Sequence, residues 1–276
     1  MRLDAHQHFW QYSPAEYGWI TDGLATLKRD FLPLDLAPLL AKSGFNGCVA
    51  VQARQSLEET QWLLGLARQN DFVKGVVGWV DLRSVKLTEQ LECFAGDEKL
   101  VGVRHIVQDE PDDEFMLGAE FRRGLARLAG YGLTYDLLLH PRHLPVAVQV
   151  VREFPELRFV LDHIAKPAIA AGTLSPWAED LRELARFDNV WCKLSGVVTE
   201  TNWKRWKPAD FRPYLDVVFE AFGVERLMIG SDWPVCTLSA DYEATIGLVT
   251  DYVAQLPAKA REAVLGGNCA RFYGIE

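Results

Sequence analysis

The fold is decided by the first predicted strand of the chain, Leu3-Asp4-Ala5-His6-Gln7-His8. In an open doubly wound sheet, the first strand leads into a glycine-rich turn that binds phosphate. Here the strand ends instead in two histidines. Reactive side chains at the carboxyl ends of strands are typical of a (β/α)8 barrel, whose strand ends meet at one mouth. This segment therefore favours the barrel over the open sheet.

Seven further short segments, apolar almost throughout, continue the pattern along the chain. Apolar runs of this kind are typical of parallel strands that are buried on both faces. They are predicted at Gly47–Ala53, Val73–Val80, Val101–Val107, Thr134–His140, Arg158–His163, Val190–Leu194 and Arg226–Gly230. Strands that alternate with helices over about 250 residues match the size of a (β/α)8 barrel.

Longer segments with a helical spacing of apolar residues lie between the predicted strands. The clearest begins with Ser56 and Glu59, spaced as in a capping box, and extends to Asn70. The other predicted helices are Leu34–Ser43, Leu87–Phe94, Glu114–Tyr131, Leu144–Phe154, Trp177–Phe187, Phe211–Phe222 and Tyr242–Leu256. No linker or shift of composition divides the chain, so we expect one domain over residues 1–276.

The composition excludes several classes of protein. Hydrophobic residues make up 49% of the chain and charged residues 24%, which excludes a disordered protein. The net charge is -9 and no block rich in Lys and Arg occurs, so we expect no nucleic-acid partner. No apolar run approaches the ~18 residues of a membrane span. With no secretory signal and five scattered cysteines, we predict a cytoplasmic protein with reduced thiols and no membrane partner.

Histidines gather at the predicted strand ends, which a barrel brings to one mouth. His6 and His8 are two residues apart on a strand, so both point to the same side and suit a divalent metal. His163 ends the sixth strand and Asp232 ends the eighth. Because the eighth strand of a barrel closes against the first, we expect Asp232 close to His6 and His8. The alternative is a group of hydrogen-bonded histidines in the barrel core.

Further residues just past strand ends are candidates for substrate binding. The polar candidates are Arg54, Arg104, His105 and Lys166, and a salt bridge at the rim is the alternative for each of them. Five tryptophans offer flat apolar faces that suit a sugar ring, with ordinary packing as the alternative. They are Trp10, Trp19, Trp203, Trp206 and Trp233.

Several of these strings resemble the amidohydrolase superfamily. The resemblance rests on His6-Gln7-His8, His163, Asp232 and the tail Leu265-Gly266-Gly267-Asn268-Cys269-Ala270-Arg271-Phe272-Tyr273-Gly274. Fuller strings are similar to its sugar-lactonase branch, and the likeness covers essentially the whole chain. Among them are Asp4-Ala5-His6-Gln7-His8-Phe9-Trp10, Val51-Gln52-Ala53-Arg54, Gly102-Val103-Arg104-His105, Leu161-Asp162-His163-Ile164-Ala165-Lys166-Pro167 and Gly230-Ser231-Asp232-Trp233-Pro234-Val235-Cys236.

The resemblance implies a hydrolase that opens a small sugar-acid lactone, such as L-fucono-1,5-lactone or a related L-sugar aldonolactone. Asp232 would activate the attacking water, with His163 as a second catalytic group. One divalent metal ion, with zinc the first candidate, would be held by His6, His8, His163 and Asp232, although dependence on a metal varies across the branch. His140, which ends the fifth predicted strand, is either a further ligand or part of the pocket wall.

One departure from the superfamily bears on the metal. The usual bridging ligand on strand four, a carboxylated lysine or a glutamate, has no counterpart here, because the strand ends in Val103-Arg104-His105. We therefore expect one metal ion or none. The alternative functions are a decarboxylase of a small aromatic or unsaturated acid, a lactonase of a dicarboxylate pyrone, and a sugar-binding barrel without catalysis.

Overall fold

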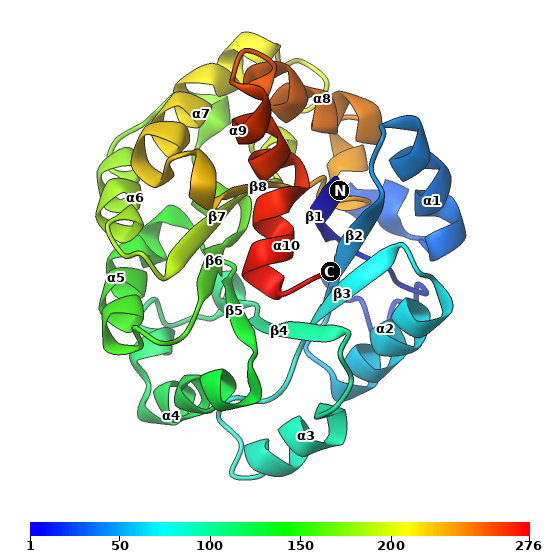
Figure 1. Cartoon of the computed structure of the whole chain (residues 1–276), viewed down its shortest axis with the longest axis vertical. Coiled ribbons are helices and arrows are strands. Elements are labelled where there is room, and N and C mark those ends of the chain that lie inside the picture. Colours follow the sequence, from blue (N-terminus) through cyan, green and yellow to red (C-terminus); the bar gives the residue numbers. More distant parts are fainter.

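Eight parallel strands form one sheet in the order β1 to β8, and helices surround it (Figure 1). The structure is a computed structural model that describes residues 1–276. The strands are β1 (Leu3–Gln7), β2 (Gly47–Val51), β3 (Val73–Gly78), β4 (Leu100–His105), β5 (Thr134–Leu137), β6 (Phe159–Leu161), β7 (Val190–Leu194) and β8 (Leu227–Ile229). Each predicted strand is present, and the predicted (β/α)8 barrel is confirmed.

The sheet closes where β8 returns to β1. Gln7 forms a parallel bridge with Trp233, and the amide of His8 donates to the carbonyl of Trp233 at 2.7 Å. The amide of Asp232 donates to the carbonyl of His6 at 2.8 Å. The seam therefore closes at the carboxyl ends of the two strands, and it places the segment around Asp232 against the end of β1.

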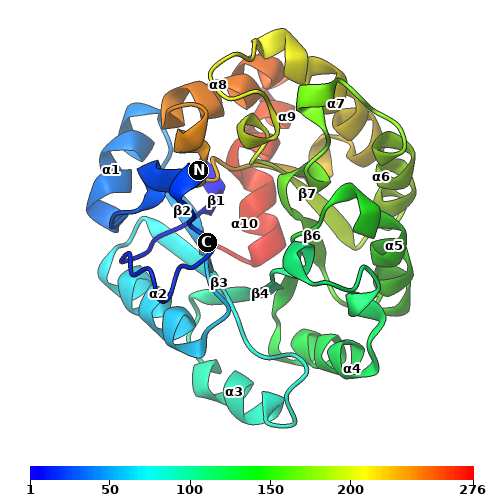
Figure 2. The same ribbon diagram turned by 180° about the vertical axis from the view of Figure 1, so that it is seen from behind.

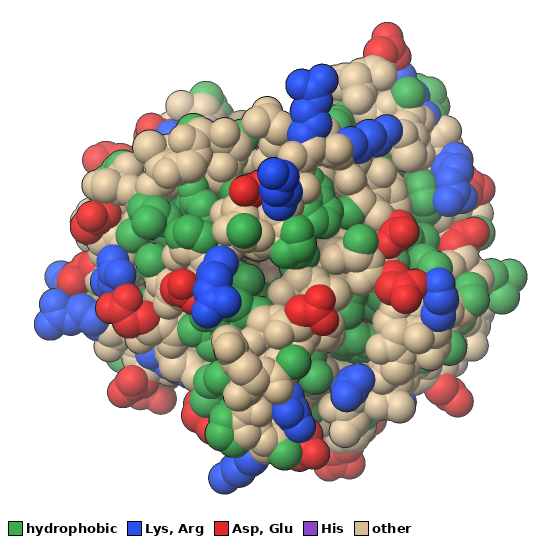
Figure 3. All heavy atoms as spheres, turned by 90° about the horizontal axis from the view of Figure 1, so that it is seen from above, with side chains coloured by type: hydrophobic (Ala, Val, Ile, Leu, Met, Phe, Trp, Pro, Cys, Tyr) green, Lys and Arg blue, Asp and Glu red, His purple; other side chains and the backbone are tan.

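The helices follow the strands in alternation. They are α1 (Pro33–Lys42), α2 (Leu57–Gln69), α3 (Leu87–Phe94), α4 (Ala119–Leu128), α5 (Leu144–Glu153), α6 (Trp177–Ala185), α7 (Pro208–Phe222), α8 (Tyr242–Val253), α9 (Ala258–Glu262) and α10 (Asn268–Tyr273). None of them is both long and apolar enough to span a membrane. On the face in Figure 3, acidic and basic side chains are interspersed.

Three details differ from the sequence predictions. The helix predicted at Glu114–Tyr131 is shorter, because Gly118 has an extended backbone before α4 and the last turn, Ala129–Tyr131, is a 3-10 helix. The short helices α9 and α10 were not predicted. The capping box of α2 forms only in part: Ser56 Oγ accepts from the Glu59 amide, whereas the Glu59 carboxylate bonds the amides of Ala53 and Arg54.

The amino-terminal half of the barrel is filled by side chains. Apolar residues from the strands pack there against Cys269, Phe272 and Tyr273 of α10. This helix crosses the barrel end that faces the viewer in Figure 1. A substrate can therefore enter only from the opposite end, which Figure 2 shows, where the strands lead into the loops before the helices.

Candidate active site

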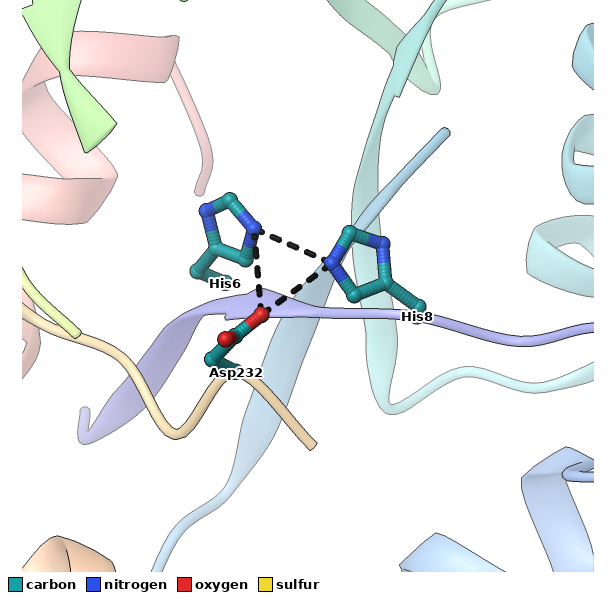
Figure 4. Close-up of side chains that lie close together, drawn as sticks. All are labelled: His6, His8 and Asp232. Carbon is teal, nitrogen blue, oxygen red and sulfur yellow. Dashed lines mark hydrogen bonds and ion pairs between the residues drawn. The ribbon is translucent and has the colours of Figure 1, made fainter. Parts of the chain in front are cut away.

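Three side chains from the two ends of the chain converge at the open end of the barrel (Figure 4). His8 Nε2 lies 3.2 Å from Asp232 Oδ1 and 3.2 Å from His6 Nε2. His6 Nε2 lies 3.8 Å from Asp232 Oδ1, and His163 Nε2 completes the group at 3.9 Å from the same oxygen. All four side chains are buried, and the predicted proximity of Asp232 to the histidines is observed.

The backbone at two of these residues is left-handed. Asp232 has φ of +57°, and His163 has φ of +55° and begins a run of four left-handed residues that ends at Lys166. Residues with a Cβ rarely adopt this conformation, which costs free energy and is found mostly where function requires it. Both turns follow directly after short strands and direct their side chains toward the barrel axis.

Each histidine is held through its second ring nitrogen. The Nδ1 atoms lie near Val51 O for His8 (2.8 Å), Ser195 Oγ for His163 (2.9 Å) and Asp162 Oδ1 for His6 (3.2 Å). A partner on the far nitrogen is typical of histidines that bind metal, because it fixes the tautomer and the orientation of the ring. This arrangement leaves the three Nε2 atoms directed toward Asp232.

The donor set fits a divalent metal ion. Because a carbonyl oxygen only accepts, His8 Nδ1 carries the proton that it donates to Val51, and Nε2 presents a lone pair. That lone pair faces a carboxylate oxygen and another ring nitrogen. Bonds of about 2.0 to 2.2 Å in a tetrahedral site place ligand atoms roughly 3.3 Å apart. His6, His8 and Asp232 can therefore hold a divalent ion, and His163 Nε2 faces the same carboxylate oxygen at 3.9 Å.

The electrostatics of the site keep the carboxylate ionised and the imidazoles of His6 and His163 neutral. Burial alone raises the pKa of Asp232, but the nearby His163 and the hydrogen bond with His8 bring that pKa well below its usual range. Burial lowers the pKa of His163 to about 4 and places that of His6 well below its usual value. At neutral pH Asp232 is therefore negatively charged beside the neutral rings of His6 and His163, which suits a cation.

A buried charge network lies beneath the histidines. Lys193 of β7 pairs with Asp136 and with Asp162, at 3.0 Å from the latter, and Arg104 pairs with Asp162 at 3.0 Å. Tyr273 of α10 donates to Asp136 at 2.8 Å. The network thus connects the closed end of the barrel to the ring of His6.

A cavity of about 120 Å³ is lined by three of the four residues, His8, His163 and Asp232. Of the predicted substrate-binding residues, Arg104 and Lys166 line it, together with Trp19. Six further lining residues were not predicted from the sequence: Ala53, Ile106, Gln108, Asp109, Leu138 and Val235. Gln108 Oε1 is buried there without a hydrogen-bond partner. A larger groove of about 810 Å³ lies at the opposite end, beside Met1 and α9, and contains none of these residues.

Other predicted site residues lie outside the cavity lining. His105 bonds Glu110 at 2.6 Å and stacks on Phe115, and Arg54 pairs with Glu16 at 2.7 Å. Trp233 is buried against Phe9 and Phe31. His140 is half-buried and is absent from both groups of residues that can bind metal. Substrate contact by these residues stays a prediction.

Comparisons with known proteins agree over the full length of the chain. The family described as Amidohydrolase matches residues 3–275. An L-fucono-1,5-lactonase of Burkholderia multivorans is 42% identical over 286 aligned residues, which cover 100% of this chain and 96% of that protein. An L-fucono-1,5-lactonase of Burkholderia ambifaria is 40% identical over 279 residues, with coverage of 100% and 96%.

A solved structure shows the same architecture. The crystal structure of an amidohydrolase from Burkholderia multivorans with bound Zn has a TM-score of 0.96 and 43% identity, and the match covers 100% of both chains.

Proposed function

Because this chain belongs to the amidohydrolase family, we propose that it is a lactonase that opens the ring of an L-sugar acid lactone. L-fucono-1,5-lactone is the first candidate substrate, since two relatives that match this chain over its full length are L-fucono-1,5-lactonases. One observation carries the proposal. The Nε2 atoms of His6, His8 and His163 converge within 3.9 Å or less on one oxygen of Asp232, at the base of a cavity.

Hydrolysis of a lactone requires an activated water, a partner for the carbonyl oxygen and a proton for the leaving oxygen. Asp232 stays ionised and accepts a hydrogen bond from the water, which it orients toward the carbonyl carbon. Its low pKa makes it a weak base, so the carbonyl must be polarised as the water attacks. Nε2 of His6 and of His8 presents a lone pair, so neither ring can donate there. His163, whose Nδ1 can accept from Ser195, is the imidazole that donates its Nε2 proton to the developing oxyanion.

Collapse of the tetrahedral species breaks the bond between the carbonyl carbon and the ring oxygen. The proton that Asp232 takes from the water passes to this oxygen and gives the free hydroxyl. The products are one hydroxyl and one carboxylic acid, which ionises and releases a proton. Lys166 lines the cavity and is in no ion pair, so it binds the oxygens of the sugar acid.

A divalent ion held by His6, His8, His163 and Asp232 would polarise the carbonyl or acidify the water. Zinc is the first candidate, because nitrogen and carboxylate ligands suit it and a related structure contains it. We place the protein in the cytoplasm, where its five free cysteines stay reduced.

The test is acid release from a panel of aldonolactones, followed with a pH indicator, with and without chelator and with metal content measured on the same sample. We expect turnover of L-fucono-1,5-lactone or of a close L-sugar relative. Asp232→Asn should lower kcat by about 10² to 10⁴, the usual contribution of a positioned acid or base. Asp109→Asn is the matched control, because Asp109 lines the same cavity but lies outside the histidine group.

A folded protein that releases no acid from any lactone of the panel would exclude the proposal. The decarboxylase alternative is tested on the same samples by CO₂ release from aromatic acids, and no contact in the site favours it over the lactonase.

A further inference from the structure

Arg104 has no free hydrogen-bond donor. The side chain lies at the end of β4 and is 3% exposed. Nε and Nη2 donate to the Gln52 side chain at 3.0 and 2.7 Å, and Nη2 also donates to the Gln52 carbonyl. Nη1 donates to Asp162 at 3.0 Å and contacts His6 Nε2 at 3.3 Å. A guanidinium carries five N–H groups, so these five contacts use all of them.

The contact with His6 fixes the tautomer of that ring. Arg104 can only donate, so His6 Nε2 must present its lone pair to it. The ring proton is then on Nδ1, where Asp162 Oδ1 lies 3.2 Å away and can accept it. Lys193 Nζ is also 3.3 Å from Nδ1, and its third N–H can donate there, beyond those directed at Asp136 and Asp162. The opposite tautomer, with the His6 proton on Nε2, is therefore the alternative that the NMR measurement below tests.

The same lone pair is required for metal binding. His6 Nε2 is the atom that lies 3.2 Å from His8 Nε2 and 3.8 Å from Asp232 Oδ1, in the group that can hold an ion. One lone pair cannot accept from Arg104 and bind a metal at the same time. A guanidinium in contact with a ligand atom also repels a divalent cation, in surroundings where water screens charges weakly.

We propose that Arg104 competes with the divalent ion for His6 Nε2. In the metal-free protein, the guanidinium occupies the lone pair of His6 and keeps the histidines aligned without an ion. The contact lowers the affinity of the site for metal. Binding of an ion releases one N–H of Arg104 at the cavity wall. The inference rests on the metal site proposed above and is independent of which lactone is opened.

The test measures metal affinity in the absence of substrate. Co²⁺ is titrated into the metal-free protein and followed by its visible absorption, and Zn²⁺ binding is measured by calorimetry. Arg104→Gln removes the charge and keeps one side-chain donor, whereas Arg104→Lys keeps the charge. We expect Arg104→Gln to bind both metals about tenfold tighter or more, and Arg104→Lys to stay close to the unmodified protein.

Arg54→Gln is the matched control. Arg54 follows the end of β2 but pairs with Glu16 outside the histidine group, so its loss should leave metal affinity unchanged. Unchanged or weaker binding by Arg104→Gln would overturn the proposal, and so would equal tightening in the Gln and Lys variants.

A second measurement needs no substitution and applies even if the variants fold poorly. In the unmodified protein, nitrogen NMR should show His6 with its proton on Nδ1, and the Arg104 Nη1 protons should exchange faster once Zn²⁺ is added. A proton on His6 Nε2 in the metal-free protein, or no change at Arg104, would contradict the inference. Because neither measurement involves turnover, a protein that opens no lactone could still show both effects.

Discussion

Gly196 is the residue on which the position of His163 depends most directly. It follows β7 with φ of +62°, and a Cβ at this position would lie 2.4 Å from His163 Nδ1. No heavy atom can approach that closely without displacing the ring. Glycine is therefore required here for two reasons: the backbone is left-handed, and the ring of His163 occupies the space of a side chain.

Gly196→Ala is expected to displace His163 and break its 2.9 Å bond to Ser195. A displacement of about 1 Å can cost 10²-fold in rate, so kcat should fall by about that factor. Gly172→Ala is the control, because Gly172 has φ of +66° but no heavy atom within 4 Å of the added Cβ. Steady-state kinetics and thermal unfolding of both variants separate the clash from backbone strain. Equal loss of activity in the two variants would contradict this account.

Lys166 is a cation at the cavity wall without a carboxylate partner. We expect Lys166→Met to lower kcat/KM by about 10- to 100-fold, mostly through KM, because hydrogen bonds to charged groups contribute about 1.5 to 3 kcal/mol. Lys207→Met, on the exposed residue before α7, should leave both constants unchanged. A fall in kcat alone would instead assign Lys166 to the chemical step.

The sequence predicted the positions of site residues that lie at strand ends, and it missed those whose positions depend on loops. His6 and His8 follow from their spacing on β1, and Asp232 follows from closure of the barrel. The direction of the His105 side chain depends on its contacts with Glu110 and Phe115, which lie in the segment after β4, where no strand pattern applies. Gln108 lies in a loop whose path no periodicity predicts.

Among the elements, α2 holds two loops of the mouth through one buried carboxylate. Glu59 accepts from the amides of Ala53 and Arg54, at 3.0 and 2.9 Å, and from the Tyr17 hydroxyl at 3.1 Å. Ala53 lines the cavity, and Tyr17 belongs to the segment that carries Trp19. A polar residue at the start of α2 thus fixes the backbone of the loop that connects β2 to this helix.

Burial raises the pKa of Glu59 from 4.5 to about 7. The folded protein therefore binds this proton more tightly than the unfolded chain, and the free energy of unfolding falls as the pH rises from about 4.5 through 7. Glu59→Gln removes this dependence, since an amide can accept from the two amides and donate to Tyr17. Between pH 5 and pH 8 we expect the variant to gain about 3 kcal/mol relative to the unmodified protein in urea unfolding.

Glu58→Gln is the control for Glu59, because Glu58 is the exposed neighbour on the same helix turn. A pH dependence that is the same in all three proteins would show that Glu59 does not titrate in this range.

The existence of each strand and of the eight major helices was predictable, whereas their ends were not. Apolar runs predict β5 and β6 well, but the ladders end at Leu137 and Leu161, before the histidines included in the predictions. At His163 the backbone turns left-handed and leaves the sheet. The helices α9 and α10 have five and six residues, which is too short for periodicity to reveal them.

In the whole molecule, α10 closes one end of the barrel and anchors the charge network beneath the site. Tyr273→Phe removes the hydroxyl that donates to Asp136, and a buried carboxylate then loses a partner. We expect the free energy of unfolding to fall by about 1 to 3 kcal/mol. Tyr252→Phe, which removes a similar bond to the exposed Asp216, should cost less. An equal cost in urea unfolding would argue against a special role for the buried network.

The seam between β1 and β8 makes function depend on the order of synthesis. The two histidines of β1 are synthesised more than two hundred residues before the carboxylate that faces them. A nascent chain that stops short of Asp232 carries imidazoles with no acid opposite, so on the proposed mechanism we expect it to be inactive however well its first half folds. We therefore expect a premature stop codon anywhere before Asp232 to leave no partly active fragment.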